Sequence, residues 1–208
     1  MPAGMTFSGH GLVCQRGGRL VFAGVTFAVE AGGALLLTGP NGSGKSSLLR
    51  MLAGLHAPAG GEIRIDDVNV RDDPDAWRRT IAFVGHHDPV KPVMTVREHL
   101  GFWAAVTGGG DVEAALDAFD LAFLADTPGR FLSAGQRRRA NLARLMVASA
   151  PIWLLDEPST ALDAASTGLL RDAMAAHRAA GGIIIASSHI PLGMGDADNL
   201  DLGRRIAA

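Results

Sequence analysis

The chain has 208 residues, a formal net charge of -2 at pH 7 and 48% hydrophobic residues. This length suffices for one domain with a substantial core, and the charge balance gives no overall basic field, so we expect no nucleic-acid partner. The one cysteine, Cys14, excludes an internal disulfide and fits a reducing compartment.

The first predicted elements lead to a glycine-rich turn. Alternating hydrophobic residues at 5–13 and 19–30 are typical of β-strands. The apolar run at 34–39 predicts a third strand, and helical spacing at 45–55 predicts a helix that ends near Gly54.

The turn between this strand and helix reads GPNGSGKS and matches the pattern G-x-x-x-x-G-K-[ST]. Glycines let successive backbone N–H groups wrap around a phosphate, and the helix N-terminus adds its positive dipole. We expect Lys45 to reach the β- and γ-phosphates and Ser46 to offer its hydroxyl to Mg²⁺. A glycine turn with a chance Lys-Ser pair is the alternative, which the strand–turn–helix setting disfavours. The expected nucleotide contacts are Gly39, Pro40, Asn41, Gly42, Ser43, Gly44, Lys45, Ser46 and Ser47.

Two adjacent histidines follow the next pair of predicted strands, at 62–65 and 80–84. Adjacent residues of an extended segment point to opposite faces, so we do not expect His86 and His87 to share one metal ion. From 95 to about 148 the pattern is mainly helical, with breaks at TGGG and DTPG.

Within this helical region, LSAGQRRRANLARL opens a helix with a second glycine turn. By itself this segment fits an ordinary helix start, with Ser133 as the N-cap and the arginines on a solvated face.

The last part of the chain contains a pair of acids at the end of a buried strand. PIWLLDEP at 151–158 places Asp156 and Glu157 there. Beside a phosphate-binding turn, Asp156 is the expected Mg²⁺ partner and Glu157 the base or orienter of the attacking water; helix-capping acids are the alternative. A helix is predicted at 164–179 and a strand at 182–187.

The longest segment without charged side chains, at 179–195, is interrupted by glycines, a proline and polar residues. It therefore predicts a buried strand and not a membrane span. The N-terminal residues lack the pattern of a signal peptide, so we expect a cytoplasmic chain. Strands alternating with helices around a helix-rich middle predict an α/β domain on a mostly parallel sheet.

Taken together, GPNGSGKSS, LSAGQ, LLDEP, STALD and SSHIP resemble, in this order, the ATPase subunits of ABC transporters. The resemblance spans nearly the whole chain. It implies one P-loop ATPase domain over 1–208, with an N-terminal antiparallel β region and a helical subdomain inserted at approximately 88–148.

The resemblance also implies a head-to-tail homodimer that binds two ATP molecules with Mg²⁺ at its interface. Ser133, Gly135 and Gln136 of one subunit would contact the γ-phosphate held by the other. Asp163 would lie at the dimer contact, and His189 would contact the γ-phosphate and help to organise the attack.

Three positions depart from the common family pattern. Ala134 replaces a glycine, which is tolerable if its φ stays negative. Arg16 stands where the family stacks an aromatic residue on adenine, and its guanidinium plane is also able to stack on a base. His86 stands where the family has the glutamine that senses Mg²⁺ and faces the membrane partner, so we expect His86 to contact Mg²⁺ or its water and His87 to be exposed.

Within the family, the chain resembles the ATP-binding subunit of the haem exporter of c-type cytochrome biogenesis. It does so in its short length and in the segments PVKPVMTVREHLGFW and LSAGQRRR. This resemblance implies transmembrane ABC subunits as partners and a peripheral place on the cytoplasmic face of the bacterial inner membrane. An ATPase of a different ABC exporter, or a soluble ABC ATPase without a transporter, remains the alternative.

Overall fold

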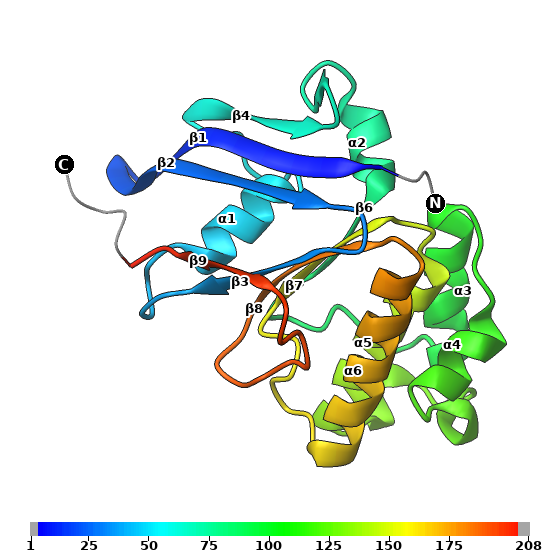
Figure 1. The fold of residues 1–208 in the computed structure, drawn as a ribbon. Helices are drawn as coiled ribbons and strands as arrows, with labels where there is room; N and C mark the ends of the chain where they lie inside the picture. The colour runs from blue at the N-terminus through cyan, green and yellow to red at the C-terminus, as the bar shows by residue number, and fades with distance from the viewer. Residues whose placement is uncertain (1–3, 204–208) are drawn as a thin grey trace.

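The computed structural model describes residues 4–203 as two β-sheets with helices between and beside them (Figure 1). The strands are β1 (Thr6–Arg16), β2 (Arg19–Glu30), β3 (Ala34–Thr38), β4 (Gly60–Ile65), β5 (Val68–Asn69), β6 (Ile81–Val84), β7 (Ile152–Asp156), β8 (Ile183–Ser187) and β9 (Asp198–Asp201). The α-helices are α1 (Lys45–Leu52), α2 (Pro74–Thr80), α3 (Val96–Thr107), α4 (Val112–Ala118), α5 (Ala134–Val147) and α6 (Ala164–Ala179). Two short 3-10 turns, at Ala122–Leu124 and Gly129–Phe131, lie between α4 and α5.

The N-terminal sheet has the strand order β2-β1-β4-β5, with each neighbouring pair antiparallel. β1 and β2 form a hairpin whose register ends at Arg16 opposite Arg19. Gly17 and Gly18 connect them with φ of 55° and 75°, which suits the two-residue hairpin turns that match strand twist. The antiparallel β region implied by the family resemblance is thus present.

The second sheet has the order β6-β7-β8-β3-β9, and all of its neighbouring strands are parallel. Parallel strands end at the same edge of a sheet, which is where such folds bind ligands. The turn after β3, the acids ending β7 and the segments after β6 and β8 therefore meet at one edge. The expected mostly parallel sheet is confirmed.

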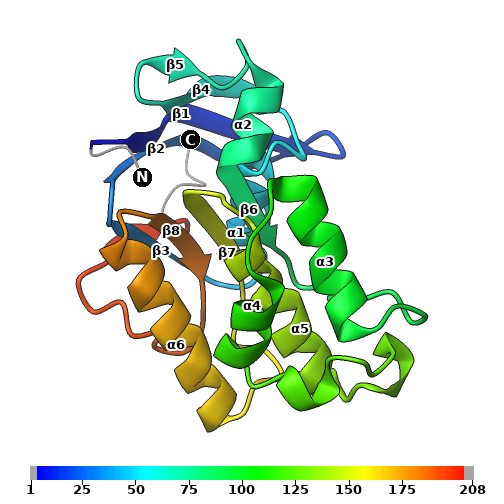
Figure 2. The same ribbon diagram turned by 90° about the vertical axis from the view of Figure 1, so that its right-hand side faces the viewer.

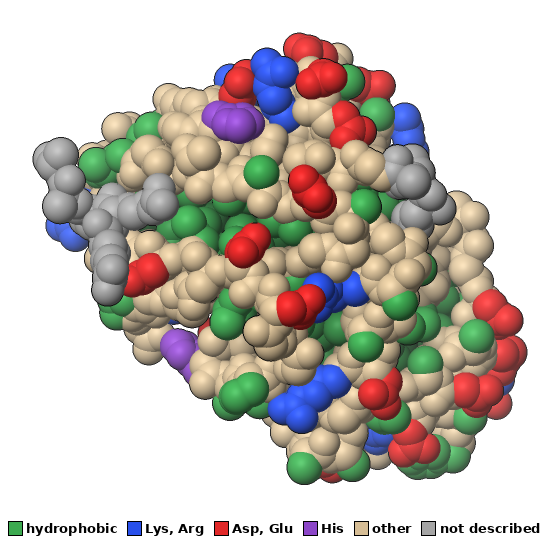
Figure 3. Space-filling view, in the orientation of Figure 1, with side chains coloured by type: hydrophobic (Ala, Val, Ile, Leu, Met, Phe, Trp, Pro, Cys, Tyr) green, Lys and Arg blue, Asp and Glu red, His purple; other side chains and the backbone are tan. Residues whose placement is uncertain are grey.

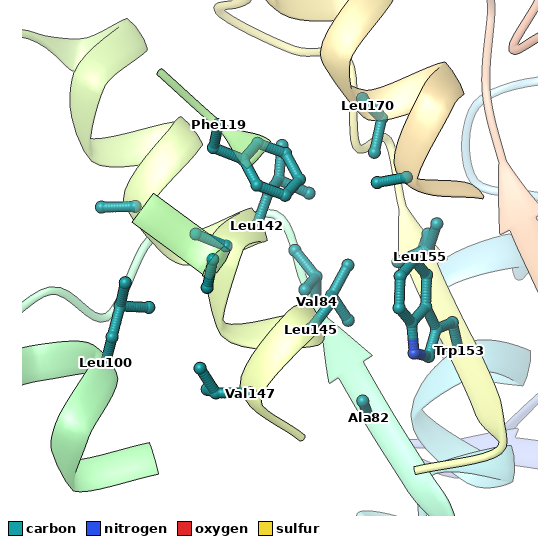
Figure 4. Packing of buried hydrophobic residues seen from close by; sticks show 14 of the residues in the cluster. Ala82, Val84, Leu100, Phe119, Leu142, Leu145, Val147, Trp153, Leu155 and Leu170 are labelled. Atoms are coloured by element: carbon teal, nitrogen blue, oxygen red, sulfur yellow. The ribbon is translucent and has the colours of Figure 1, made fainter. Parts of the chain in front are cut away.

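The core has two parts because both faces of the parallel sheet are covered. Along β7, Ile152 and Leu154 pack in one hydrophobic cluster with α1 and the antiparallel sheet, whereas Trp153 and Leu155 pack in the other with the later helices. This alternation follows from the period of two along a strand. Figure 4 shows residues of the second cluster, among them Leu142 and Leu145 of α5 and Trp153 and Leu155 of β7.

Figures 1 and 2 place α1 between the two sheets and gather α3, α4, α5 and α6 on the opposite side of the parallel sheet. In the sequence, α3, α4 and α5 lie between β6 and β7, which agrees with the expected helical insertion. No helix within residues 4–203 is long and apolar enough to cross a membrane. On the face shown in Figure 3, acidic and basic side chains are interspersed.

Candidate functional site

The turn between β3 and α1 leaves the helix N-terminus open to a ligand. Gly44 is the N-cap residue of α1, with φ of 101°, and no side chain caps the helix. A Cβ at this position would lie 2.8 Å from side-chain atoms of Val21 and Phe22, so glycine is required for both conformation and space. The first turn of α1 also has no acidic residue. This helix start therefore has the features that anion binding requires: free N–H groups and no acidic side chain nearby.

Lys45 is folded over the same turn. Its Nζ donates hydrogen bonds to the carbonyl oxygens of Gly39, at 2.7 Å, and Pro40, at 3.2 Å, and the residue is 9% exposed. Both partners are neutral, so they hold the ammonium group in place without neutralising it. A phosphate in the turn would meet this charge together with the N–H groups of α1.

Ser46 and Asp156 meet as the sequence predicts. The Ser46 hydroxyl donates to Asp156 Oδ1 at 3.0 Å, and the Ser187 hydroxyl, from β8, donates to the same oxygen at 2.9 Å. Asp156 is 2% exposed. Sequence reasoning missed Ser187, although its place at the end of a predicted buried strand next to that of Asp156 was a signal.

The donor set of Ser46 and Asp156 fits Mg²⁺. This cation prefers oxygen ligands and is commonly held by one or two carboxylates together with phosphates and water. Residues 4–203 contain no cluster of three or more histidine, cysteine or acidic residues that could hold a metal ion by themselves. Ser46 and Asp156 therefore suit a cation that arrives with a nucleotide.

Glu157 has an unusual backbone and a carboxylate with a free oxygen. Its φ is 48°, a left-handed conformation that costs a non-glycine residue about 1–2 kcal/mol. Its N–H bonds to Ser187, and its Oε2 accepts from the backbone N–H of His189 at 3.3 Å. Its Oε1 lies 3.4 Å from His189 Nε2, within ion-pair distance, but is buried and has no hydrogen-bond partner.

These groups line one cavity of about 320 Å³. Its lining combines the glycine turn with both acids and the histidine that follows β8: Val21, Asn41, Gly42, Gly44, Lys45, Ser46, Ser47, Asp156, Glu157 and His189. The parallel strand order explains how segments more than 100 residues apart converge. The cavity offers positive charge for phosphate, oxygens for a cation, and a carboxylate for an attacking water.

The LSAGQ segment lies away from this cavity. Ser133 is the N-cap of α5; its hydroxyl accepts from Gln136 N–H at 3.2 Å, and the Gln136 side chain accepts from Ser133 N–H at 2.8 Å. Ala134 is exposed and helical, so its methyl group needs no positive φ, as expected. A Cβ on Gly135 would lie 3.1 Å from the Ala161 carbonyl oxygen, so this turn packs against STALD.

Asp163, in STALD, is the N-cap of α6 and accepts from Ser166 N–H at 2.7 Å. This hydrogen bond lowers the pKa of the Asp163 carboxyl below its usual value.

His86 and His87 line a second cavity of about 390 Å³, together with Arg50, Leu55, His56, Phe83, Gly85, Pro89 and Arg144. Both histidines are exposed, and their ring centroids are 5.7 Å apart. The expectation that adjacent rings face opposite sides is wrong, because the chain bends at these residues and does not continue as an extended strand. His86 is not among the residues that line the first cavity.

Arg16, at the end of β1, is exposed and lies beside the second cavity. Its Nη2 lies 3.0 Å from His56 Nε2. Burial, followed by the charges of Arg16 and Arg50, lowers the pKa of His56. Arg16, like Ser133, Gly135 and Gln136, is not part of the lining of the first cavity.

Arg138 is the other residue that sequence reasoning missed. It follows Arg137 in α5 and is 1% exposed, so the reading of all three arginines as a solvated face is wrong for this one. A signal was present: Arg138 precedes Leu142 and Leu145 by four and seven residues, the spacing of one helix face, and both leucines are buried.

Comparisons with known proteins agree with this geometry. Residues 22–160 match the ABC transporter family. The chain is 54% identical over 203 residues to the cytochrome c biogenesis ATP-binding export protein CcmA of Paramagnetospirillum magneticum, covering 95% of this chain and 94% of the relative. It is 57% identical over 185 residues to the protein of the same name from Rhodospirillum rubrum, covering 88% and 79%.

Solved structures show the same fold. The structure of an ATP binding subunit of an ABC transporter superposes with a TM-score of 0.85 at 26% identity, covering 97% of this chain and 88% of that one. A bacterial Atm1-family ABC exporter with ATP bound gives a TM-score of 0.83 at 26% identity, covering 100% of this chain and 39% of that one.

Proposed function

Because this chain belongs to the ABC transporter family, and is thus a nucleotide-binding ABC ATPase, we propose that it drives haem export or delivery for c-type cytochrome biogenesis. The similarity to relatives named for cytochrome c biogenesis and export, at 54% and 57% identity, supports this assignment over another exporter. The whole chain acts as one ATPase domain, with the helical subdomain at approximately 88–148.

ATP binds with its phosphates in the turn at 39–46. The N–H groups of the turn and of α1 hold the phosphate oxygens, Lys45 supplies the positive charge, and Arg16 is the candidate to stack on adenine. Ser46 and Asp156 would hold Mg²⁺, which, when bound, would offset the negative charge that develops on the phosphates. His86 lines the neighbouring cavity and would contact this cation or its water only after a movement of its loop.

Glu157 acts on the water. Its carboxylate accepts a proton as the water oxygen attacks the γ-phosphorus, and the bond from that phosphorus to the β–γ bridging oxygen breaks, so that ADP leaves with the bonding electrons. His189 donates a hydrogen bond to the γ-phosphate. The observation that carries this role is that Glu157, whose buried Oε1 has no hydrogen-bond partner, lines the same cavity as Lys45 and Ser46.

A second subunit completes the site. The exposed start of α5, with Ser133, Gly135 and Gln136, is a helix N-terminus that does not line its own chain's cavity. In a head-to-tail homodimer it contacts the γ-phosphate held by the other subunit. The cavity beside His86 faces the transmembrane partner subunits, which place the chain peripherally on the cytoplasmic face of the bacterial inner membrane.

The experiment is complementation of a strain that lacks this chain. We expect covalently haem-bearing c-type cytochromes to be lost, to return with the parent gene, and to stay absent with Glu157→Gln expressed at the same level. The b-type cytochromes, whose haem is not covalently attached, serve as the control and should be unchanged. Normal c-type cytochromes in the deletion strain would contradict the haem assignment.

A further inference from the structure

The guanidinium of Arg138 binds the strand end that carries the proposed base. Its Nη2 donates to the carbonyl oxygen of Glu157 at 2.7 Å and to that of Asp156 at 3.4 Å, and its Nε donates to that of Pro158 at 3.0 Å. Three consecutive carbonyl groups at the end of β7 are thus held by one side chain. One of them belongs to Glu157, the one residue of the proposed site that has a left-handed backbone and is not glycine.

The same guanidinium also binds the loop of the adjacent histidines. Its Nη1 donates to the Gly85 carbonyl oxygen and to Asp88 Oδ1, both at 2.9 Å. Asn141, one turn further along α5, donates to the same Asp88 oxygen at 2.7 Å. Gly85 and Asp88 flank His86 and His87, so both ends of that bend are attached to α5.

We propose that Arg138 is a positioning residue for ATP hydrolysis, which fixes the backbone of Glu157 and couples it to the His86–His87 loop. The inference rests on the proposed role of Glu157 as the base. A guanidinium is a rigid planar fork with donors on three nitrogens, which here reach acceptors from two separate segments. A displacement of either segment is therefore transmitted to the other through one rigid group.

Lysine is the informative replacement. It keeps the positive charge beside Asp88, but its donors lie on a single nitrogen and cannot span both segments. A group misplaced by about 1 Å costs on the order of 100-fold in rate, so we expect Arg138→Lys to lower kcat by about 10- to 100-fold. The ATP affinity should stay within about twofold, because Arg138 does not line the nucleotide cavity.

A double-mutant comparison separates positioning from general damage. If Arg138 acts through the Glu157 carboxylate, Arg138→Lys should cause little further loss of kcat in a Glu157→Gln background. A role in folding alone would reduce both backgrounds by the same factor. Arg178→Lys is the matched control, since Arg178 also bonds a carbonyl group and a carboxylate, those of Gly32 and Asp196, but lies away from both loops.

The measurements are kcat, ATP affinity and Tm of the full chain in its membrane complex. Arg178→Lys should lower Tm with kcat near that of the parent. Asp88→Asn provides a second variant should Arg138→Lys not fold. It weakens the hydrogen bond between Arg138 and the His86–His87 loop. The loss of kcat that it causes should also vanish in the Glu157→Gln background.

The inference is overturned if folded Arg138→Lys has the parental kcat, or if it lowers kcat by the same factor in the parent and in the Glu157→Gln background. Either result for Asp88→Asn would also overturn it. Failure of the proposed function would be seen separately, as parental turnover in Glu157→Gln with Arg138 intact.

Discussion

At the scale of single residues, the site combines buried polar atoms that lack partners with charges held by neutral groups. Glu157 Oε1 and Ser43 Oγ are both buried without a hydrogen bond, and leaving such an atom unpaired costs about 1–3 kcal/mol. Lys45, by contrast, has two hydrogen bonds from its ammonium group, both to carbonyl oxygens. A water molecule that hydrogen-bonds to Glu157 would recover part of that cost.

The lysine in the glycine turn gives the first prediction. Lys45→Ala should weaken ATP binding by at least about 100-fold, because a charge-assisted contact to phosphate is lost within a partly closed cavity. Binding of a fluorescent ATP analogue to the purified chain measures this. The only other lysine, Lys91, is exposed, so Lys91→Ala is the control and should bind like the parent. Near-parental affinity in folded Lys45→Ala would refute the phosphate-binding role.

The bend after β6 gives the second prediction. His86→Ala should lower ATPase activity of the membrane complex and its stimulation by the partner, and leave ATP binding nearly intact because Lys45 and the turn carry it. His86→Gln should retain more activity, since the amide oxygen is also able to bind Mg²⁺ or its water. Steady-state ATPase rates compare the variants. Equal activity in all of them would remove His86 from the site.

At the scale of whole elements, the hydrophobic pattern of the sequence predicts the helices and strands that bury an apolar face. The helix expected at 164–179 is present as Ala164–Ala179, and the strand at 182–187 as Ile183–Ser187. Three short elements were not predicted: α2 buries no residue, β5 has two residues, and only Leu200 is buried in β9. Short polar elements carry no periodic signal, so only tertiary contacts reveal them.

The candidate site was also predictable only where a local sequence pattern marks its residues. The glycine turn, Asp156 and Glu157 follow from a motif and a strand end, and the structure brings them into one cavity. The convergence of Arg138 on two loops was not predictable, because it depends on how α5 packs against the ends of β6 and β7. The bend at His86 and His87 was missed for a related reason: a local rule for extended chain does not apply beyond the last strand residue.

Two histidines in separate helices, His99, which is buried, and His177, which is half-buried, give a prediction about pH. Burial lowers the pKa of His99, in α3, and of His177, in α6, to about 4. The ordinary histidine pKa, which applies when the chain is unfolded and the side chains are solvated, is 6.5. As pH falls from 6.5 toward 4, the unfolded chain therefore takes up protons that the folded chain does not, and stability must decrease.

Thermal unfolding of the purified chain between pH 7.5 and about 4 tests this linkage. His177 stacks on Trp153 with ring centroids 3.9 Å apart, so His177→Phe keeps a ring against the tryptophan but cannot titrate. Its Tm should fall less steeply with decreasing pH than that of the parent. Identical slopes would show that His177 does not contribute to the acid sensitivity.

At the scale of the whole molecule, the two halves of the proposed site lie apart. The cavity with Lys45 and Glu157 is formed by the ends of the parallel strands, whereas Ser133 opens α5 elsewhere on the surface. One chain thus offers a phosphate site and a separate exposed helix start. In the head-to-tail pair that we propose, they would meet twice, with an ATP at each junction.

Assembly of the proposed pair gives a prediction about the oligomeric state of the chain. With Glu157→Gln, the γ-phosphate that bridges two subunits should persist, so ATP should convert the chain from monomer to dimer. Sedimentation with ATP and with ADP is the comparison, and Lys45→Ala combined with Glu157→Gln is the control that should stay monomeric. A monomer at saturating ATP and high protein concentration would contradict a stable sandwich.

The central claim, that this fold hydrolyses ATP with Glu157 as the base, is tested most directly by the turnover of Glu157→Gln in the membrane complex. The amide keeps the shape of the side chain but is unable to accept the proton. Loss of a general base typically costs 10²–10⁴-fold, so we expect a reduction of about that size in kcat, with ATP affinity retained. Turnover equal to that of the parent would contradict the account.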